Sequence, residues 1–430
     1  MPSQQLSSEE NDGFSAKFPN IELREDANPA QHTPLYPSLA RIGYVPDLEL
    51  HQARLQSSRK RLQASGGVGN LPKEWPQVLQ GPLVWSGSDL QTSNEWVYNF
   101  SEIDIKEIRS GLEHCKGLKL ELSQVKKTSF PLPRLGRILE DLSSKLHNGR
   151  GFFILKGLDP KEFTREDNVI LYLGISSYIA EQRGRQSHDG SLITHITDAV
   201  LSNTPRPERP SLYSNVAQPY HNDITPDILA LYCLNSAISG GKNCIASSWT
   251  VYNELAATRL DIIRTLAENS WNTAGGFTPL KSHALLYNNS KGRPILNFSR
   301  RILTSNDNFP RTRDFSLFEP LTEAQAEALD AVNFTAVKHG LEINLLPGDM
   351  CFINNLALLH GRNAFEDSDE SKRYFLRLWL RDPERAWDIP EGLRKVHDLV
   401  FQPQPDVEDH WDIDPYSAKG HELKSSTNCG

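Results

Sequence analysis

The feature that most constrains this chain is a set of potential metal ligands divided between two remote segments. His221 and Asp223 form a His-x-Asp triplet, and the next residue of suitable chemistry, His360, lies far downstream. Side chains alternate along an extended chain, so His221 and Asp223 project to one side if 220–223 is a strand or an open turn. A fold that uses all three side chains must bring the two segments together.

A His-x-acid triplet is weak evidence when it stands alone. With 13 His and 54 acidic residues in 430, chance alone yields roughly one or two such triplets. A second example, from His410 to Asp412, lies near the C-terminus, where only His421 follows and no pair of arginines remains. We therefore expect no site at the second triplet.

The run 373–380 predicts a strand that carries two arginines on an apolar face. In an extended chain Arg373, Phe375, Arg377 and Trp379 share that face. Burying two arginines without partners has a high desolvation cost, so a bound anion is the economical explanation. The alternative is that both arginines face solvent or pair with carboxylates of the chain, which is the commoner environment of arginine.

The three candidate ligands and the arginines together indicate a metal site with an anionic co-substrate. Two histidines and one carboxylate on one face of a metal leave the other positions open, as in the non-haem Fe(II) enzymes that activate dioxygen. A zinc-dependent hydrolase that uses the same residues around a bound water is an alternative, but it leaves the arginines unexplained. A non-catalytic binding protein is a third possibility, and the complete ligand set counts against it.

Hydrophobic periodicity predicts several helices, most of them in the first half of the chain. We expect them over 45–64, 103–118, 135–146 and 164–179. A further helix is expected over 322–337, because Thr322 and Gln325 match a capping box and Gly340 is placed to end the helix.

Strand patterns surround the candidate ligands. We expect strands over 151–155, 229–234, 342–346 and 350–353. The last two are expected to form a hairpin through the turn residues Pro347, Gly348 and Asp349. The long separation of the ligands and the early helices favour a mostly β fold with flanking α-helices, whose core is a double-stranded β-helix, or jelly roll, rather than a parallel doubly wound sheet.

The chain is expected to have four parts. Residues 1–35 are polar and lack periodicity, which predicts a disordered N-terminal arm. We expect an extension that wraps the core over 36–100, the jelly-roll domain over 101–390 and a C-terminal extension over 391–430.

Composition excludes several classes of protein. A net charge of −8 without a long basic block argues against nucleic acid as a partner. The sequence has neither a run of 18 apolar residues nor an apolar N-terminal segment, so we expect no membrane partner and a cytoplasmic location. The five cysteines are dispersed and include no Cys-x-x-Cys pair, so we expect neither a disulfide framework nor a structural zinc site.

Longer blocks of the sequence resemble the taurine dioxygenase family, also called clavaminate synthase-like, of Fe(II)- and 2-oxoglutarate-dependent oxygenases. The resemblance is strongest to a fungal branch and spans about 80–390. It rests on YHNDITPDI at 220–228, SGGKNCIASS at 239–248, VYNEL at 251–255, GDMCFINN at 348–355, LHGR at 359–362 and RYFLRLWLRD at 373–382.

The resemblance implies a cofactor set and a role for each ligand. It implies that His221, Asp223 and His360 bind Fe(II), and that dioxygen and 2-oxoglutarate are the co-substrates. Arg373 is expected to hold the distal carboxylate of 2-oxoglutarate. Relatives often carry Thr or Ser shortly after the Gly-Gly pair, where this chain has Asn243, and that residue is expected to contact 2-oxoglutarate instead.

The resemblance also implies a small-molecule substrate. Arg377 is expected to meet an anionic group on it, which favours a small anionic or zwitterionic compound. Hydroxylation, desaturation and oxidative ring closure are all open, and an amino-acid-derived precursor in specialised metabolism is the preferred hypothesis. A taurine-like sulfonate is the alternative, and the oligomeric state is left open.

Overall fold

The computed structural model describes residues 42–64, 71, 75–199, 209, 211–224, 226–273, 278, 280–304 and 320–415. All of them belong to one unit of the chain, Leu39–Gly430. The arm expected over 1–35 lies outside the described residues, as does the end of the expected C-terminal extension. The expected boundaries at 100/101 and 390/391 stay predictions.

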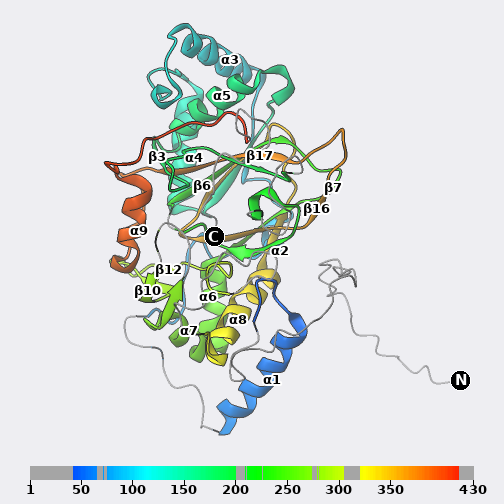
Figure 1. Ribbon diagram of the computed structural model, residues 1–430, viewed down its shortest axis with the longest axis vertical. Helices are drawn as coiled ribbons and strands as arrows, with labels where there is room; N and C mark the ends of the chain where they lie inside the picture. The colour runs from blue at the N-terminus through cyan, green and yellow to red at the C-terminus, as the bar shows by residue number, and fades with distance from the viewer. Residues whose placement is uncertain are drawn as a thin grey trace, which may run out of the picture. The chain divides into compact units, whose positions relative to one another are not determined.

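Two largely antiparallel sheets build the core (Figure 1). The major sheet has the order β1 (Val97–Asn99), β2 (Phe152–Lys156), β14 (Met350–Asn354), β6 (Ile228–Asn235), β17 (Tyr374–Arg381) and β3 (Gln182–Gly184), with β4 (Thr194–Thr197) also paired to β17. The minor sheet has the order β13 (Leu341–Ile343), β8 (Asn243–Ser247), β15 (Leu358–Arg362) and β5 (Gln218–His221). Paired sheets of this kind form a jelly roll, so the expected fold class is confirmed.

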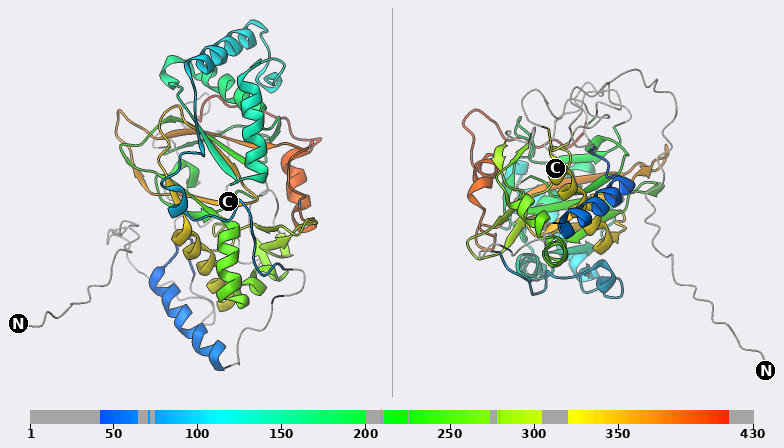
Figure 2. Two further views of the ribbon diagram at one scale, coloured as in Figure 1. Left: turned by 180° about the vertical axis from the view of Figure 1, so that it is seen from behind. Right: turned by 90° about the horizontal axis from the view of Figure 1, so that it is seen from below.

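Helices cover the outer face of the major sheet. They are α3 (Glu102–Gly117), α4 (Leu135–Asn148) and α5 (Arg165–Ser177), and Figure 2 shows the same layer from behind. Their apolar side chains share one hydrophobic cluster with the outward-facing residues of β17, which are Leu376, Leu378 and Leu380. Phe375 and Trp379 face the other way, into the cluster that includes residues of the minor sheet. The alternation expected over 373–380 is therefore confirmed.

A second helical layer lies below the sheets in Figure 1. It contains α6 (Ser248–Thr258), α7 (Leu260–Ala267), α8 (Glu323–His339) and α1 (Leu48–Ala64). The capping box at the start of α8 is confirmed, since Thr322 accepts from the backbone N–H of Gln325 and the Gln325 side chain accepts in return. A buried ion pair between Asp330 of α8 and Arg54 of α1, at 2.7 Å, joins α1 to this layer. Asp330 also pairs with buried Arg300, at 2.8 Å.

Further elements lie outside the two sheets and these helical layers. They are α2 (Gly87–Leu90), α9 (Glu391–Phe401), three short 3-10 helices (Leu122–Gln124, Pro160–Glu162 and Ser211–Tyr213), and the strand pairs β7 (Ser239–Gly240) with β16 (Phe365–Glu366), β9 (Trp271–Thr273) with β10 (Leu280–His283), and β11 (Leu286–Asn288) with β12 (Pro294–Leu296).

The hairpin expected between 342–346 and 350–353 is wrong. β13 pairs with β8 in the minor sheet, whereas β14 lies between β2 and β6 in the major sheet. Both edges of β14 are therefore occupied, and the turn at 347–349 carries the chain from one sheet to the other. Gly348 is held there by a hydrogen bond from its N–H to the carbonyl of Cys233, at 2.8 Å.

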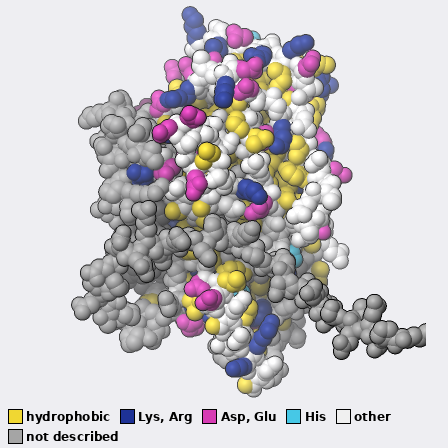
Figure 3. Space-filling view, turned by 90° about the vertical axis from the view of Figure 1, so that its right-hand side faces the viewer, with side chains coloured by type: hydrophobic (Ala, Val, Ile, Leu, Met, Phe, Trp, Pro, Cys, Tyr) yellow, Lys and Arg dark blue, Asp and Glu magenta, His cyan; other side chains and the backbone are white. Residues whose placement is uncertain are grey.

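The surface carries charges of both signs. On the face shown in Figure 3, basic and acidic side chains are interspersed with apolar ones. Within the described ranges, no helix combines the length and the apolar character needed to cross a bilayer.

Gly348 provides a test of the crossover. Its φ is +96°, and a Cβ there would lie 1.8 Å from the carbonyl oxygen of Leu158. We expect Gly348→Ala to destabilise the protein by roughly 2–4 kcal/mol, because backbone strain and a clash with backbone are combined. The measurement is the midpoint of thermal or denaturant unfolding.

The matched control is Gly292→Ala. Gly292 also has a positive φ, +68°, but a Cβ there meets nothing within 4 Å. Gly292→Ala should lower the free energy of unfolding by about 1–2 kcal/mol, because only the left-handed conformation disfavours the alanine. Equal losses in the two variants would contradict the tight crossover.

Candidate iron and co-substrate site

Strand pairing brings the two remote histidines together. β5 and β15 are antiparallel neighbours, and His221 is directly opposite His360, with ring centroids 4.2 Å apart. The register shifts between His360 and Arg362, which lie opposite His221 and Gln218, so β5 has a bulge that includes Pro219. Proline cannot donate to a sheet ladder and is tolerated at such bulges, which re-aim neighbouring side chains.

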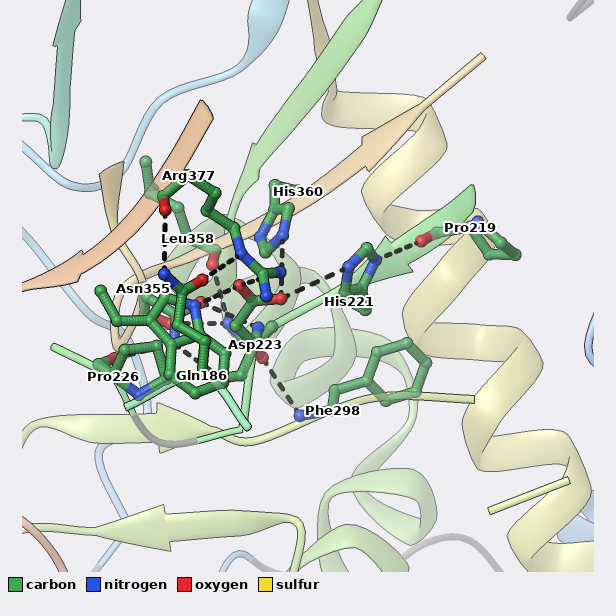
Figure 4. A network of polar contacts seen from close by, with 12 residues as sticks. Gln186, Pro219, His221, Asp223, Pro226, Phe298, Asn355, Leu358, His360 and Arg377 are labelled. Carbon is green, nitrogen blue, oxygen red and sulfur yellow. Dashed lines mark hydrogen bonds and ion pairs between the residues drawn. The ribbon is translucent and has the colours of Figure 1, made fainter. Parts of the chain in front are cut away.

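The ligand atoms of His221, Asp223 and His360 converge, all lying within 4.8 Å of one another. The Oδ1 atom of Asp223 is 3.9 Å from Nε2 of His221 and 3.6 Å from Nε2 of His360 (Figure 4). Nδ1 of His221 lies 2.8 Å from the carbonyl oxygen of Pro219. When Nδ1 carries the proton, its N–H donates to that carbonyl, and the Nε2 lone pair is directed at the centre of the three ligand atoms, as metal binding requires.

The two oxygens of Asp223 have different surroundings. Oδ2 accepts from Nη1 of Arg377 at 3.0 Å and from Nε1 of Trp379 at 2.7 Å. Oδ1 is buried and has no hydrogen-bond partner. A buried carboxylate oxygen is rarely left unsatisfied, so the structure fits a cation at Oδ1.

The protonation states suit a metal. Burial alone would raise the pKa of Asp223, but Arg377 and the two histidines hold this pKa well below its usual range. Burial, with His360 adding to it, lowers the pKa of His221 to about 3. The site therefore presents an ionised carboxylate beside a neutral imidazole near neutral pH, which is the form in which both side chains bind metals.

Asparagines shape the loop that carries Asp223. Oδ1 of Asn355 accepts from the backbone N–H of Asp223 at 3.0 Å, and its Nδ2 donates to the carbonyls of Asp223 and Pro226 (Figure 4). Asn222 donates to the carbonyls of Asn355 and Leu358. Sequence reasoning missed both roles. For Asn355, the available signal was the pair Asn354-Asn355 directly after the apolar run 350–353.

Arg373 lies just before β17 and is buried. Its guanidinium is 4.1 Å from the centroid of the Phe375 ring, and its Nη1 has no hydrogen-bond partner. Burial, with Arg362 adding to it, lowers the pKa of Arg373 to about 9. Among the described residues, no carboxylate forms an ion pair with the guanidinium of Arg373, and the charge of Asp367 offsets only part of the effect of burial on the pKa of Arg373.

Arg377 has a different environment. Its Nε donates to Oε1 of Gln186 at 2.7 Å, and its Nη1 pairs with Asp223. The alternative of pairing with an internal carboxylate therefore holds for Arg377. Its expected contact with the substrate stays a prediction.

All six predicted site residues line one cavity. Asn243, the first residue of β8, contributes an Nδ2 atom that is buried without a hydrogen-bond partner. The apolar part of the lining includes Ile196, Leu212, Leu229, Leu231 and Phe375. By contrast, His410 of the second triplet pairs with Asp412 and Asp189, and these residues form no converging ligand group in the described structure.

Comparison with known proteins decides the family. The family model "Taurine catabolism dioxygenase TauD, TfdA family" matches residues 116–379. The taurine hydroxylase-like protein SAT17 of Stachybotrys chartarum is 34% identical over 334 residues, covering 75% of this chain and 85% of that protein. The chain belongs to the TauD/TfdA family.

A second curated protein and a solved structure are also similar to this chain. FR-33289 synthase of Streptomyces rubellomurinus is 24% identical and covers 74% of this chain and 95% of that protein. The structure of an asparagine oxygenase in complex with Fe(II), 3-hydroxyasparagine and succinate superimposes with a TM-score of 0.52 at 17% identity, over 68% of this chain and 95% of that chain. The latter shows the shared fold.

This TauD/TfdA protein is therefore a 2-oxoglutarate-dependent non-haem iron dioxygenase, with Fe(II), 2-oxoglutarate and dioxygen as its cofactor and co-substrates. Family membership decides against the zinc hydrolase and against the non-catalytic binding protein.

The loop around Asn355 gives a testable prediction. Asn355→Ala leaves a buried N–H and two buried carbonyls without their partner, which should cost about 1–3 kcal/mol for each unsatisfied group. Because the variant also releases Asp223, we expect the affinity for Co(II), used as a probe, to fall about 10- to 100-fold. Optical titration of the metal-free protein measures it.

Asn253→Ala is the control. Asn253 makes a similar two-way contact, accepting from the N–H of Leu79 and donating to its carbonyl, away from the metal ligands. It should lower stability and leave Co(II) affinity unchanged. Unchanged affinity in Asn355→Ala would show that the loop does not depend on this residue.

Proposed function

We propose that this dioxygenase oxidises a small anionic or zwitterionic substrate, with an amino-acid-derived precursor in specialised metabolism as the preferred class. The observation that carries the proposal is Arg377, a buried arginine in the lining of the cavity that also contains the converged ligand atoms. Nε2 of His221, Nε2 of His360 and Oδ1 of Asp223 would hold the iron. Bound Fe(II) supplies the chemistry that couples oxidative decarboxylation of 2-oxoglutarate to oxidation of a substrate C–H bond.

The protein's own residues bind and orient the reactants. Arg373 holds the distal carboxylate of 2-oxoglutarate through charge-assisted hydrogen bonds, which offset the cost of burying its charge. Asn243 donates to the same co-substrate through its unsatisfied Nδ2. The apolar lining of Leu229, Leu231 and Phe375 excludes water and keeps the reactants in register.

The substrate meets Arg377 in this proposal. Arg377 lines the cavity while Gln186 and Asp223 hold its guanidinium in place. An anionic group of the substrate approaches it from the cavity, so that hydroxylation, desaturation or oxidative ring closure depends on which C–H bond this contact places near the iron. A taurine-like sulfonate is the alternative, supported by the name of the SAT17 relative.

The net charge of the chain bears on its location and its partners. We propose a cytoplasmic protein whose partners are small molecules, with neither nucleic acid nor membrane among them. The net charge of −8 supports this, because a negative chain is repelled by phosphate backbones.

Removing Arg373 should chiefly weaken 2-oxoglutarate binding. We expect Arg373→Ala to lose roughly 2–5 kcal/mol of binding free energy, because a buried charge loses its partner. Anaerobic calorimetry on the Fe(II)-loaded protein measures it. Arg183→Ala is the control, since Arg183 is partly buried but donates to the carbonyls of Val125 and Leu173. Wild-type affinity in Arg373→Ala would contradict the assignment.

A substrate panel tests the proposed class. Wild-type protein with Fe(II) and 2-oxoglutarate should form succinate faster with one or more members of a panel of amino acids and their derivatives than without substrate. The measurement is succinate released over the background without substrate. Stimulation by taurine and other sulfonates alone would support the alternative and overturn the amino-acid hypothesis.

A further inference from the structure

Trp379 contacts the carboxylate of Asp223 from the side away from the cavity. It lies on β17, is fully buried, and its Nε1–H donates to Oδ2 of Asp223 at 2.7 Å. Trp379 is absent from the lining of the cavity, which Asp223 and Arg377 do line. The indole therefore touches the carboxylate and has no direct access to a substrate in the cavity.

The contact divides the carboxylate of Asp223 into two unlike oxygens. Oδ2 receives two donors, Trp379 and Arg377, whereas Oδ1 receives none and points to both histidine Nε2 atoms. A carboxylate held in this way offers one oxygen to a metal. That matters for this chemistry, because a second coordinating oxygen would occupy a position needed by the co-substrates.

The two donors contribute differently. Arg377 supplies a positive charge that keeps Asp223 ionised, and its position depends in turn on Gln186. Trp379 supplies a neutral N–H on a rigid ring. β17 pairs with β6 and β3 at this residue, opposite Leu229 and Gly184, so neighbouring strands on both sides fix its backbone. The indole can therefore fix the direction of the carboxylate without changing its charge.

We propose that Trp379 is a positioning residue that restricts Asp223 to one-oxygen metal binding. The inference rests on the proposed role of Asp223 as an iron ligand and extends it to a residue that does not touch the metal. β17 and the residue that precedes it then contribute three side chains to the site along one face. Arg373 binds the co-substrate, Arg377 neutralises Asp223, and Trp379 orients it.

Ordinary core packing is the competing explanation, and a matched pair of variants separates the two. Trp379→Phe removes the N–H and keeps an aromatic ring. Trp271→Phe removes an equally buried indole N–H, which donates to the backbone carbonyl of Thr265 at 2.8 Å instead of to a metal ligand. If Trp379 only packs, both variants lose thermal stability and neither changes metal binding.

The measurement is optical titration of the metal-free protein with Co(II), together with the thermal unfolding midpoint of each variant. We expect Trp379→Phe to bind Co(II) about 10- to 100-fold more weakly than wild type, as is typical when a partner of a metal ligand is removed. Trp271→Phe should bind as wild type does. Equal Co(II) affinity in all three proteins would overturn the inference.

A second measurement needs no folded Trp379 variant. In wild-type protein labelled with ¹⁵N in its 8 tryptophans, adding Zn(II) should shift the Trp379 indole N–H resonance and leave that of Trp271 in place. The Trp271 resonance is assigned by its loss in Trp271→Phe, and that of Trp379 by selective broadening with Co(II). No shift in any indole N–H would also overturn the inference.

Failure of the inference is distinguishable from failure of the proposed function. His360→Ala removes a proposed ligand and should abolish tight Co(II) binding. If wild type and His360→Ala bind Co(II) equally, the ligand assignment itself is wrong. If His360→Ala loses binding while Trp379→Phe retains it, the site stands and only the role of Trp379 is wrong.

Discussion

The site depends on one buried negative charge, that of Asp223. Removing a carboxylate from water is costly unless its charge and its lone pairs are matched. The chain matches one oxygen with Arg377 and Trp379 and leaves the other for a cation between two histidines. The loop that carries Asp223 is held in turn by hydrogen bonds to Asn355. Side chains from β17 of the major sheet and from β5 and β15 of the minor sheet surround the same carboxylate.

Arg373, just before β17, and Arg377, within it, complete this charge balance in opposite ways. The charge of Arg377 is matched within the chain by Asp223, whereas Arg373 has no such partner among the described residues. Their spacing of four positions on one face lets their guanidinium groups reach different anions. A co-substrate that carries a carboxylate and chelates iron would satisfy Arg373 and the cation site at once, which links the cofactor chemistry to the electrostatics of these side chains.

The sequence predicted the residues of the site but not all of the side chains that hold them in place. Period-two alternation along β17 predicted which side chains share a face, and the spacing of His221 and Asp223 predicted one metal. The pairing of Arg377 with Asp223 was not predictable, because it depends on the register between β17 and a loop remote in sequence. The contacts of Asn355 with the backbone of Asp223 were not predictable for the same reason. The hairpin expectation failed because local turn residues do not reveal that neighbouring strands already occupy both edges of β14.

The most direct test of the account is anaerobic titration of the metal-free protein with Fe(II) and then 2-oxoglutarate, followed in the visible range. A chelate of the keto acid at an Fe(II) site gives a weak metal-to-ligand charge-transfer band. The account predicts this band in wild type and its loss in His360→Ala, since one of the three converging ligand atoms is removed. No band in wild type, together with tight binding of Zn(II), would contradict it.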